Sequence, residues 1–152
     1  MANPTEPGLQ NYSLIQQIFL LGDDLDRRLL AGFGLSVSRF NLLRHLAENG
    51  PLTATDLCRR LLCDKANVTR LLAGLEQAGL VTRVPDAADG RRAVVSLTLS
   101  GRERLETSNA AYQAAVVRRA AGFSSQEKLT LNELLSLLKA AMEEQLAREE
   151  KV

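Results

Sequence analysis

Residues 53–79, which read TATDLCRRLLCDKANVTRLLAGLEQAG, decide the fold. Thr53 and Asp56 have the spacing of a capping box, in which two side chains satisfy each other's free backbone N–H groups at a helix start. Asp64 is a second helix-capping residue, and Gly79 is a typical stop signal. The stretch therefore predicts two helices joined by a tight turn, a helix-turn-helix. The residues expected to form the shared core are Leu57, Leu61, Val68, Leu71, Leu72 and Leu75.

The hydrophobic pattern changes after Gly79. Apolar residues at 80, 81 and 84 precede the turn-forming sequence PDAADG at 85–90, and apolar residues follow at 94, 95, 97 and 99. Two β-rich segments around such a turn predict a hairpin, extending through Leu99. A hairpin placed directly after a helix-turn-helix is a wing.

Long helices are predicted on both sides of this core. Residues 11–31 have helical spacing with apolar side chains on more than one face, and Gly32 and Gly34 end the helix. Ser36 or Ser38 starts the next helix, which runs to about residue 48. Ser100 is expected to cap a helix to about residue 121, and Ser124 a last one. The fold class is therefore mainly α with a small β-hairpin wing. Residues 1–10 contain two prolines and are expected to form a flexible arm.

The composition excludes several classes of protein. Of 152 residues, 45% are hydrophobic and 24% charged, which is ordinary globular usage. No apolar run is long enough to span a bilayer and no signal peptide is recognisable, so a cytoplasmic location is expected. With one histidine and two cysteines, neither a Cys/His metal site nor a disulfide scaffold is expected. We expect no cofactor.

The charge distribution favours nucleic acid as a partner. The net charge is only +1, but residues 58–104 contain nine Lys or Arg against five acids. A basic middle segment is what a DNA-binding lobe requires. On the second helix of the motif, Lys65, Asn67, Thr69 and Arg70 lie on the outer face, where such side chains can bond base edges in the major groove. An isolated helix of this kind is usually just solvated; the preceding helix, the turn and the hairpin favour DNA.

The turn of the hairpin places Arg91 and Arg92 beside Gly90. Their guanidinium groups can extend into a minor groove, whose negative potential attracts arginine. Asp89 has the position to hold Arg91 by a bidentate pair. The alternative is an ordinary polar turn with one weak surface salt bridge.

Six short segments in this order resemble the MarR family of bacterial transcription regulators. They are LTATDL (52–57), DKANVTRLL (64–72), LEQAGLV (75–81), RVPD (83–86), DGR (89–91) and SLT (96–98) followed by Gly101. The resemblance covers residues 35–105. It implies a homodimer in which the terminal helices intertwine and each subunit presents a winged helix-turn-helix to half of a pseudo-palindromic duplex site. The implied division is a dimerisation helix (11–34), a DNA-binding domain (35–104) and C-terminal dimerisation helices (105–152).

The resemblance also assigns roles to individual positions. Lys65, Ala66, Asn67, Thr69 and Arg70 match the stretch that reads the groove, and Arg91, with Asp89 behind it, matches the wing residue of the minor groove. Hydroxyls at helix starts can bind phosphate; these are Ser36, Ser38, Thr53 and Thr55. The pair Ala73 and Gly74 departs from the family, which often has a bulkier charged pair there, and this puts a phosphate contact at that place in doubt.

The family typically senses small, often anionic, aromatic effectors or oxidants. A possible redox role falls on Cys58 and Cys63, although free cysteines are more often small packing residues. Neither matches the cysteine of the family's peroxide sensors. His45 is interpreted as a structural or surface residue. The effector itself is not identified by the sequence.

The expected function is that of a transcription regulator that acts as a repressor, and two other functions compete with it. An enzyme is not expected, because the sequence has no catalytic triad order, no Gly-rich phosphate loop and a single unpartnered histidine. A winged-helix module for protein contacts is the alternative, since a fold does not determine function. It predicts that Asn67, Arg70 and Arg91 are dispensable for any binding of nucleic acid.

Overall fold

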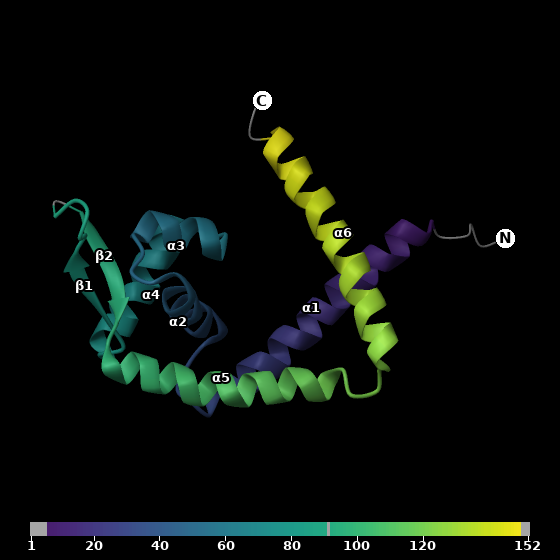
Figure 1. The fold of residues 1–152 in the computed structure, drawn as a ribbon, viewed down its shortest axis with the longest axis horizontal. Helices are drawn as coiled ribbons and strands as arrows, with labels where there is room; N and C mark the ends of the chain where they lie inside the picture. The colour runs from purple at the N-terminus through teal and green to yellow at the C-terminus, as the bar shows by residue number, and fades with distance from the viewer. Residues whose placement is uncertain (1–5, 91, 150–152) are drawn as a thin grey trace. The chain divides into compact units, whose positions relative to one another are not determined.

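The computed structural model of the chain describes residues 6–90 and 92–149. In chain order, its elements are α1 (Pro7–Ala31), α2 (Val37–Asn49), α3 (Ala54–Leu61), α4 (Lys65–Gln77), β1 (Val81–Pro85), β2 (Ala93–Leu97), α5 (Leu99–Arg119) and α6 (Ser125–Glu149) (Figure 1). The predicted fold class, mainly helical with a two-stranded wing, is confirmed.

Packing divides the chain into two compact units, Met1–Tyr112 and Gln113–Val152. The division falls inside α5. The reason is that the first part of α5 still contributes buried residues to the first unit, namely Leu105 and Ser108. None of the residues described beyond position 120 is buried.

The first helix starts earlier than the sequence pattern predicted. It begins at Pro7, not near Asn11. Proline is favourable in the first helical turn, because the N–H group that it lacks would have no partner there. Residues 7–10 of the expected arm are therefore helical, and residues 1–5 lie outside the described part of the chain.

The core of the first unit is built on the helix-turn-helix. Leu57, Val68, Leu72 and Leu75 are buried as predicted, and Leu61 and Leu71 are half-buried at its edge. The other elements complete it with Leu30, Leu35, Phe40, Leu42, Leu43, Leu46, Leu52, Leu80, Val81, Val95, Leu97 and Leu105. This continuous core holds α4 and the wing in a fixed relation, which positions the candidate site.

Three helix starts follow the predicted local chemistry. The Ser36 hydroxyl accepts the Arg39 backbone N–H, so Ser36 and not Ser38 caps α2. Thr53 and Asp56 form the complete capping box of α3. The Asp64 carboxylate accepts the Asn67 N–H at 2.7 Å and starts α4. These caps satisfy N–H groups that have no partner within the helix.

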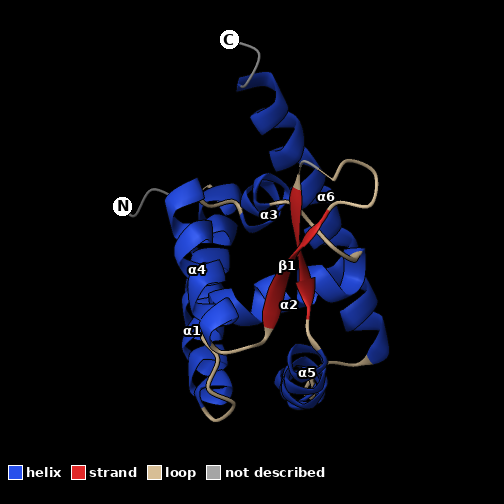
Figure 2. Ribbon diagram, turned by 90° about the vertical axis from the view of Figure 1, so that its left-hand side faces the viewer, coloured by secondary structure: helices blue, strands red, loops and turns tan. Residues whose placement is uncertain are grey.

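The wing is an antiparallel hairpin in which Val81 pairs with Leu97 and Pro85 with Ala93 (red in Figure 2). Leu52, between α2 and α3, exchanges two backbone hydrogen bonds with Val95, at 3.1 and 2.8 Å. This bridge, which the sequence did not reveal, attaches the wing to the start of the helix-turn-helix.

The prediction that the second wing segment extends through Leu99 and that Ser100 caps the next helix is wrong. Leu99 is the first residue of α5. The hydroxyl of Thr98 accepts the Gly101 N–H at 3.0 Å, and it donates to the Gly79 carbonyl at 2.6 Å. Thr98 is therefore the capping residue of α5. Its hydroxyl bonds both the first turn of α5 and the turn that follows α4.

The terminal helices expose much apolar surface. α6 has no buried residue, and its start is capped as predicted by Ser124 and Glu127. Large apolar side chains exposed on it include Leu131, Leu134, Leu135, Leu138, Met142 and Leu146. On α1 they include Leu14, Ile18, Phe19, Leu21 and Leu25. No described helix is long and apolar enough to cross a bilayer.

Candidate nucleic-acid interface

The polar face of α4 is the centre of the candidate site. Lys65, Ala66, Thr69 and Arg70 are exposed, and Asn67 is half-buried. The Arg70 guanidinium donates to the Asn67 side-chain carbonyl at 3.0 Å, and the Thr69 hydroxyl donates to the Lys65 carbonyl at 2.8 Å. The Asn67–Arg70 bond holds two candidate base-reading side chains together, which lowers the conformational entropy lost if both bind one ligand.

The four predicted helix-start hydroxyls are not equivalent. Ser36 and Thr53 are engaged as caps, and the Thr53 hydroxyl also donates to the Asp56 carboxylate at 2.5 Å. Ser38 and Thr55 are exposed in the first turns of α2 and α3. Of the four, Ser38 and Thr55 therefore have the hydroxyls best placed to contact a phosphate group.

The wing turn is shaped by Asp86. Its backbone N–H donates to the Arg92 carbonyl at 2.8 Å, and its carboxylate accepts the Ala88 N–H at 2.9 Å. Asp89 and Arg92 are exposed; Arg91, the residue expected to enter the minor groove, lies outside the described residues. At the base of the wing, Arg83 pairs with Glu76 of α4 at 2.8 Å.

Arg39 is a candidate contact that sequence reasoning missed. A Cβ atom added at Gly74 would collide with the Arg39 guanidinium, so this group of α2 lies directly on the surface of α4. Gly74 follows Arg70 by one helical turn and shares its face. In the described chain, Arg39 has no carboxylate partner. The Arg39 guanidinium therefore continues the polar face formed by Asn67 and Arg70. It supplies a positive charge at the place where the absence of a side chain on Gly74 had put a phosphate contact in doubt.

The capping box of α3 predicts a pH-dependent stability. The hydrogen bonds from Thr53 lower the pKa of Asp56 below its usual value, helped slightly by Arg59 and by Arg92 of the wing. A lowered folded-state pKa means that this stabilisation is present above about pH 4, the range of a free Asp, and is lost as the pH falls through the folded-state pKa. We expect Asp56→Asn to cost about 1 kcal/mol at pH 7, and less at pH 3, in urea unfolding.

The partner of Asp56 supplies the control for this experiment. In a chain that already carries Thr53→Ala, Asp56→Asn should cost much less, because the two side chains act as a unit. A cost of Asp56→Asn that is the same at pH 7 and pH 3 would contradict the assignment.

Cys63, one of the two cysteines, is not activated by its surroundings. Both are half-buried and free. Burial raises the pKa of the Cys63 thiol, and the neighbouring Cys58 and Asp64 raise it further. Because the thiolate is the reactive form, a raised pKa disfavours reaction with oxidants. The environment of Cys63 supports a packing role for this residue and gives no support to a redox role for it.

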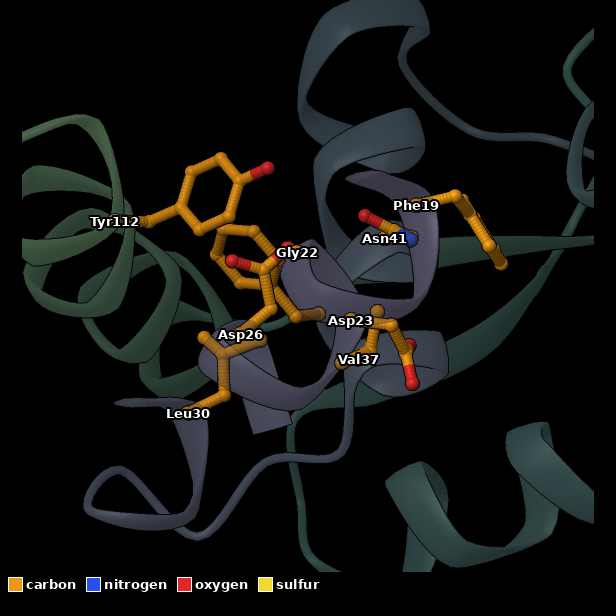
Figure 3. A pocket seen from close by; sticks show the side chains of 9 residues that line it. Phe19, Gly22, Asp23, Asp26, Leu30, Val37, Asn41 and Tyr112 are labelled. Atoms are coloured by element: carbon orange, nitrogen blue, oxygen red, sulfur yellow. The ribbon is translucent and has the colours of Figure 1, made fainter. Parts of the chain in front are cut away.

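A cavity of about 210 Å³ lies between α1, α2 and the first part of α5 (Figure 3). Its aromatic residues are Phe19, Phe40 and Tyr112, with the last two ring centroids 5.0 Å apart. The remaining residues of its lining are Gly22, Asp23, Asp26, Leu30, Val37 and Asn41. His45 is not part of this lining. The residues of this lining could not be identified from local sequence patterns, because its walls come from three separate helices.

Comparison with known proteins gives a consistent result. Residues 33–92 match the model of the MarR family. An uncharacterized HTH-type transcriptional regulator of Bacillus subtilis (strain 168), YdgJ, is 34% identical over 106 residues, which are 70% of this chain and 65% of YdgJ, just under two thirds of its length. The uncharacterized HTH-type transcriptional regulator Mb0904 of Mycobacterium bovis is 31% identical over 110 residues, covering 72% of this chain and 77% of the relative.

The fold has a close counterpart among solved structures. A mutant of MarR from E. coli, crystallised in complex with operator DNA, superimposes with a TM-score of 0.77 at 23% sequence identity. The match covers 90% of this chain and 99% of the other. At this identity, the similarity shows the fold alone.

Proposed function

The chain belongs to the MarR family of transcriptional regulators, which are not enzymes, and from this premise we propose that it is a homodimeric repressor whose hold on duplex DNA is released by a small effector. The observation that carries the proposal is the Asn67–Arg70 pair on the polar face of α4, extended by Arg39 and flanked by the wing. The E. coli protein with the same fold has been crystallised with operator DNA. A protein that acts on DNA in this way works in the cytoplasm.

In the proposed complex, α4 lies in the major groove and the wing in the neighbouring minor groove. Asn67 and Arg70 read base edges, with Lys65, Ala66 and Thr69 beside them. Arg39, Ser38 and Thr55 contact phosphates, together with backbone N–H groups at the helix starts that Ser36 and Thr53 cap. Arg91 and Arg92 at the wing tip contact the minor groove, with Asp89 supporting them.

A homodimer is proposed because the terminal helices have apolar faces that a single chain leaves in water. Along α6, Leu131, Leu135, Leu138 and Met142 recur at helical spacing, and all are exposed. Contiguous exposed apolar patches mark interaction surfaces. In a symmetric dimer, the same apolar face of each chain packs against the other. Such a dimer presents two wings and two α4 helices to one duplex, with the two α4 helices about 34 to 36 Å apart. By occupying a promoter, such a dimer represses transcription.

Control by an effector is proposed from the position of the cavity. Val37, Phe40 and Asn41 of α2 contribute to its wall. Arg39 of the same helix lies on Gly74 of α4. A ligand that moves α2 therefore changes the position of a proposed phosphate contact and of the helix that reads the bases. Such control requires only that the effector binds one arrangement of α2 more tightly than another.

Substitutions of two arginines test this function. With fluorescently labelled duplexes that include the protein's own upstream region, Arg70→Ala is expected to cost about 1–3 kcal/mol and to relax sequence preference, as loss of a base contact does. Arg39→Ala should weaken binding to all duplexes alike and reduce the salt dependence by about one unit of slope, as loss of one phosphate contact does. The measurement is fluorescence anisotropy at several salt concentrations.

The matched control is Arg148→Ala, which removes an exposed arginine of α6. This variant should bind DNA as the wild type does. If no duplex is preferred, and if neither Arg70→Ala nor Arg39→Ala changes the binding, the chain is a winged-helix module for protein contacts. That result would overturn the proposal.

A further inference from the structure

We propose that the effector cavity between α1, α2 and α5 takes an aromatic cation, such as an aryl amidine or amine, and not the anionic aromatic compound expected from the family resemblance. This inference rests on the proposed function, because it names the class of the effector, but binding of the cation can be measured without DNA. The argument depends on the charges and rings that line the cavity.

The charged groups of the lining are both acidic. They are Asp23 and Asp26, and no basic residue is among the nine described residues that form the wall. Asp23 is paired with Arg27 at 3.0 Å. Figure 3 shows the Asp26 carboxylate directed toward Tyr112, whereas the Asp23 carboxylate points away from that ring. An anion bound here would be repelled by carboxylate groups, whereas a cation would be attracted.

The aromatic residues favour the same class of ligand. Phe19, Phe40 and Tyr112 are among the lining residues, and the faces of aromatic rings attract cations as well as aromatic groups. Arg44 already uses this property: its guanidinium lies 5.8 Å from the centroids of both Phe40 and Tyr112. Arg44 is not part of the lining, and its charge is balanced by Glu48 at 3.4 Å. The charged residues of the lining itself are therefore aspartates only.

The size and the polar groups of the cavity fit a small aromatic cation. Its volume of about 210 Å³ exceeds that of an engineered cavity of ~150 Å³ that binds benzene. Asn41 offers an amide on the α2 side, opposite the carboxylate of α1. An amidinium group has N–H donors in a planar fork that matches a carboxylate in two places. A ligand bound in this way connects α1 with α2.

Three probes with the same ring and different charges test the proposal. Benzamidinium, benzamide and benzoate are titrated into the ¹⁵N-labelled full chain at pH 7, and NMR shifts are followed at the Gly22 backbone amide and the Asn41 side-chain amide, both in the wall. We expect saturable shifts with benzamidinium, at least about tenfold tighter binding than with benzamide, and the weakest binding with benzoate. Benzoate binding as tight as benzamidinium, or no shift at these amides with any probe, would overturn the proposal.

Two aspartates of one helix provide matched variants. Asp26→Asn should remove the preference for benzamidinium over benzamide. Asp24→Asn should keep it, since Asp24 pairs with Arg28 at 2.7 Å and is not in the wall. If Asp26→Asn still prefers benzamidinium over benzamide, the Asp26 carboxylate does not bind the cation. The comparison of the three probes on the wild type decides the chemical class of the effector even if this variant does not fold.

The same protein is tested for DNA binding by anisotropy with and without benzamidinium. Binding of DNA without binding of the cation rejects the cation site alone. Binding of the cation without binding of DNA rejects the regulator function and leaves the site in place.

Discussion

Replacing Leu135 and Leu138 together by Asp is expected to convert the protein into monomers and to lower its affinity for operator DNA by at least about 100-fold. Both side chains belong to the apolar stripe of α6 and are partly exposed in the single chain. In the proposed dimer they are covered, and a carboxylate at either position has no partner to compensate for the loss of water. Monomers bind each half-site separately, so the gain from tethering two DNA-binding lobes is lost.

Size-exclusion chromatography with light scattering measures the mass, and anisotropy measures the DNA affinity. The matched control is Leu129→Asp with Leu137→Asp, because these residues are also exposed on α6 but lie on a different face from the stripe. The control should remain dimeric. A monomeric wild type, or a double Leu135/Leu138 variant that stays dimeric, would reject α6 as the dimerisation surface.

Gly101→Ala is expected to destabilise the first unit by about 3 kcal/mol, at the upper end for overpacking. A Cβ atom at this buried position would collide with the backbone carbonyl oxygen of Leu80. That carbonyl cannot move aside, because it also accepts the Thr98 N–H at 3.1 Å, and the Leu80 N–H is itself bonded to Leu75. The start of α5 would have to separate from the turn after α4, breaking the Thr98 cap.

Thermal unfolding followed by circular dichroism measures this effect, with an expected decrease in Tm of about 10 °C. Gly74→Ala is an instructive control, since its Cβ would also collide, but only with the mobile end of Arg39. Alanine is favoured over glycine within a helix by about 1 kcal/mol, so Gly74→Ala should be as stable as the wild type while binding DNA like Arg39→Ala. Equal melting temperatures for the two alanine variants would contradict the explanation.

The helix-turn-helix was predictable because its signals are local. Thr53 with Asp56, and Asp64 with the Asn67 N–H, are three residues apart, and the apolar spacing of α4 separates its buried face from its polar face without knowledge of any other element. The candidate DNA-reading residues follow from that separation. The start of α1, which is at Pro7, was predicted less well. The start of α5 was also predicted less well, because Ser100 and Thr98 are both suitable caps and only the Gly79 carbonyl, distant in sequence, selects Thr98.

The sequence by itself determined the order of the helices, the wing and the polar face of α4, since these depend on hydrogen bonds and periodicity within a few residues. Only the tertiary structure decided that Arg39 lies on Gly74, that Gly101 faces the Leu80 carbonyl, and that Asp26, Asn41 and Tyr112 surround one cavity. Each of these joins residues from elements whose approach depends on how the whole core packs. Close packing of the core allows only one arrangement of such residues. That arrangement depends on all the core side chains together, so no local sequence motif predicts it.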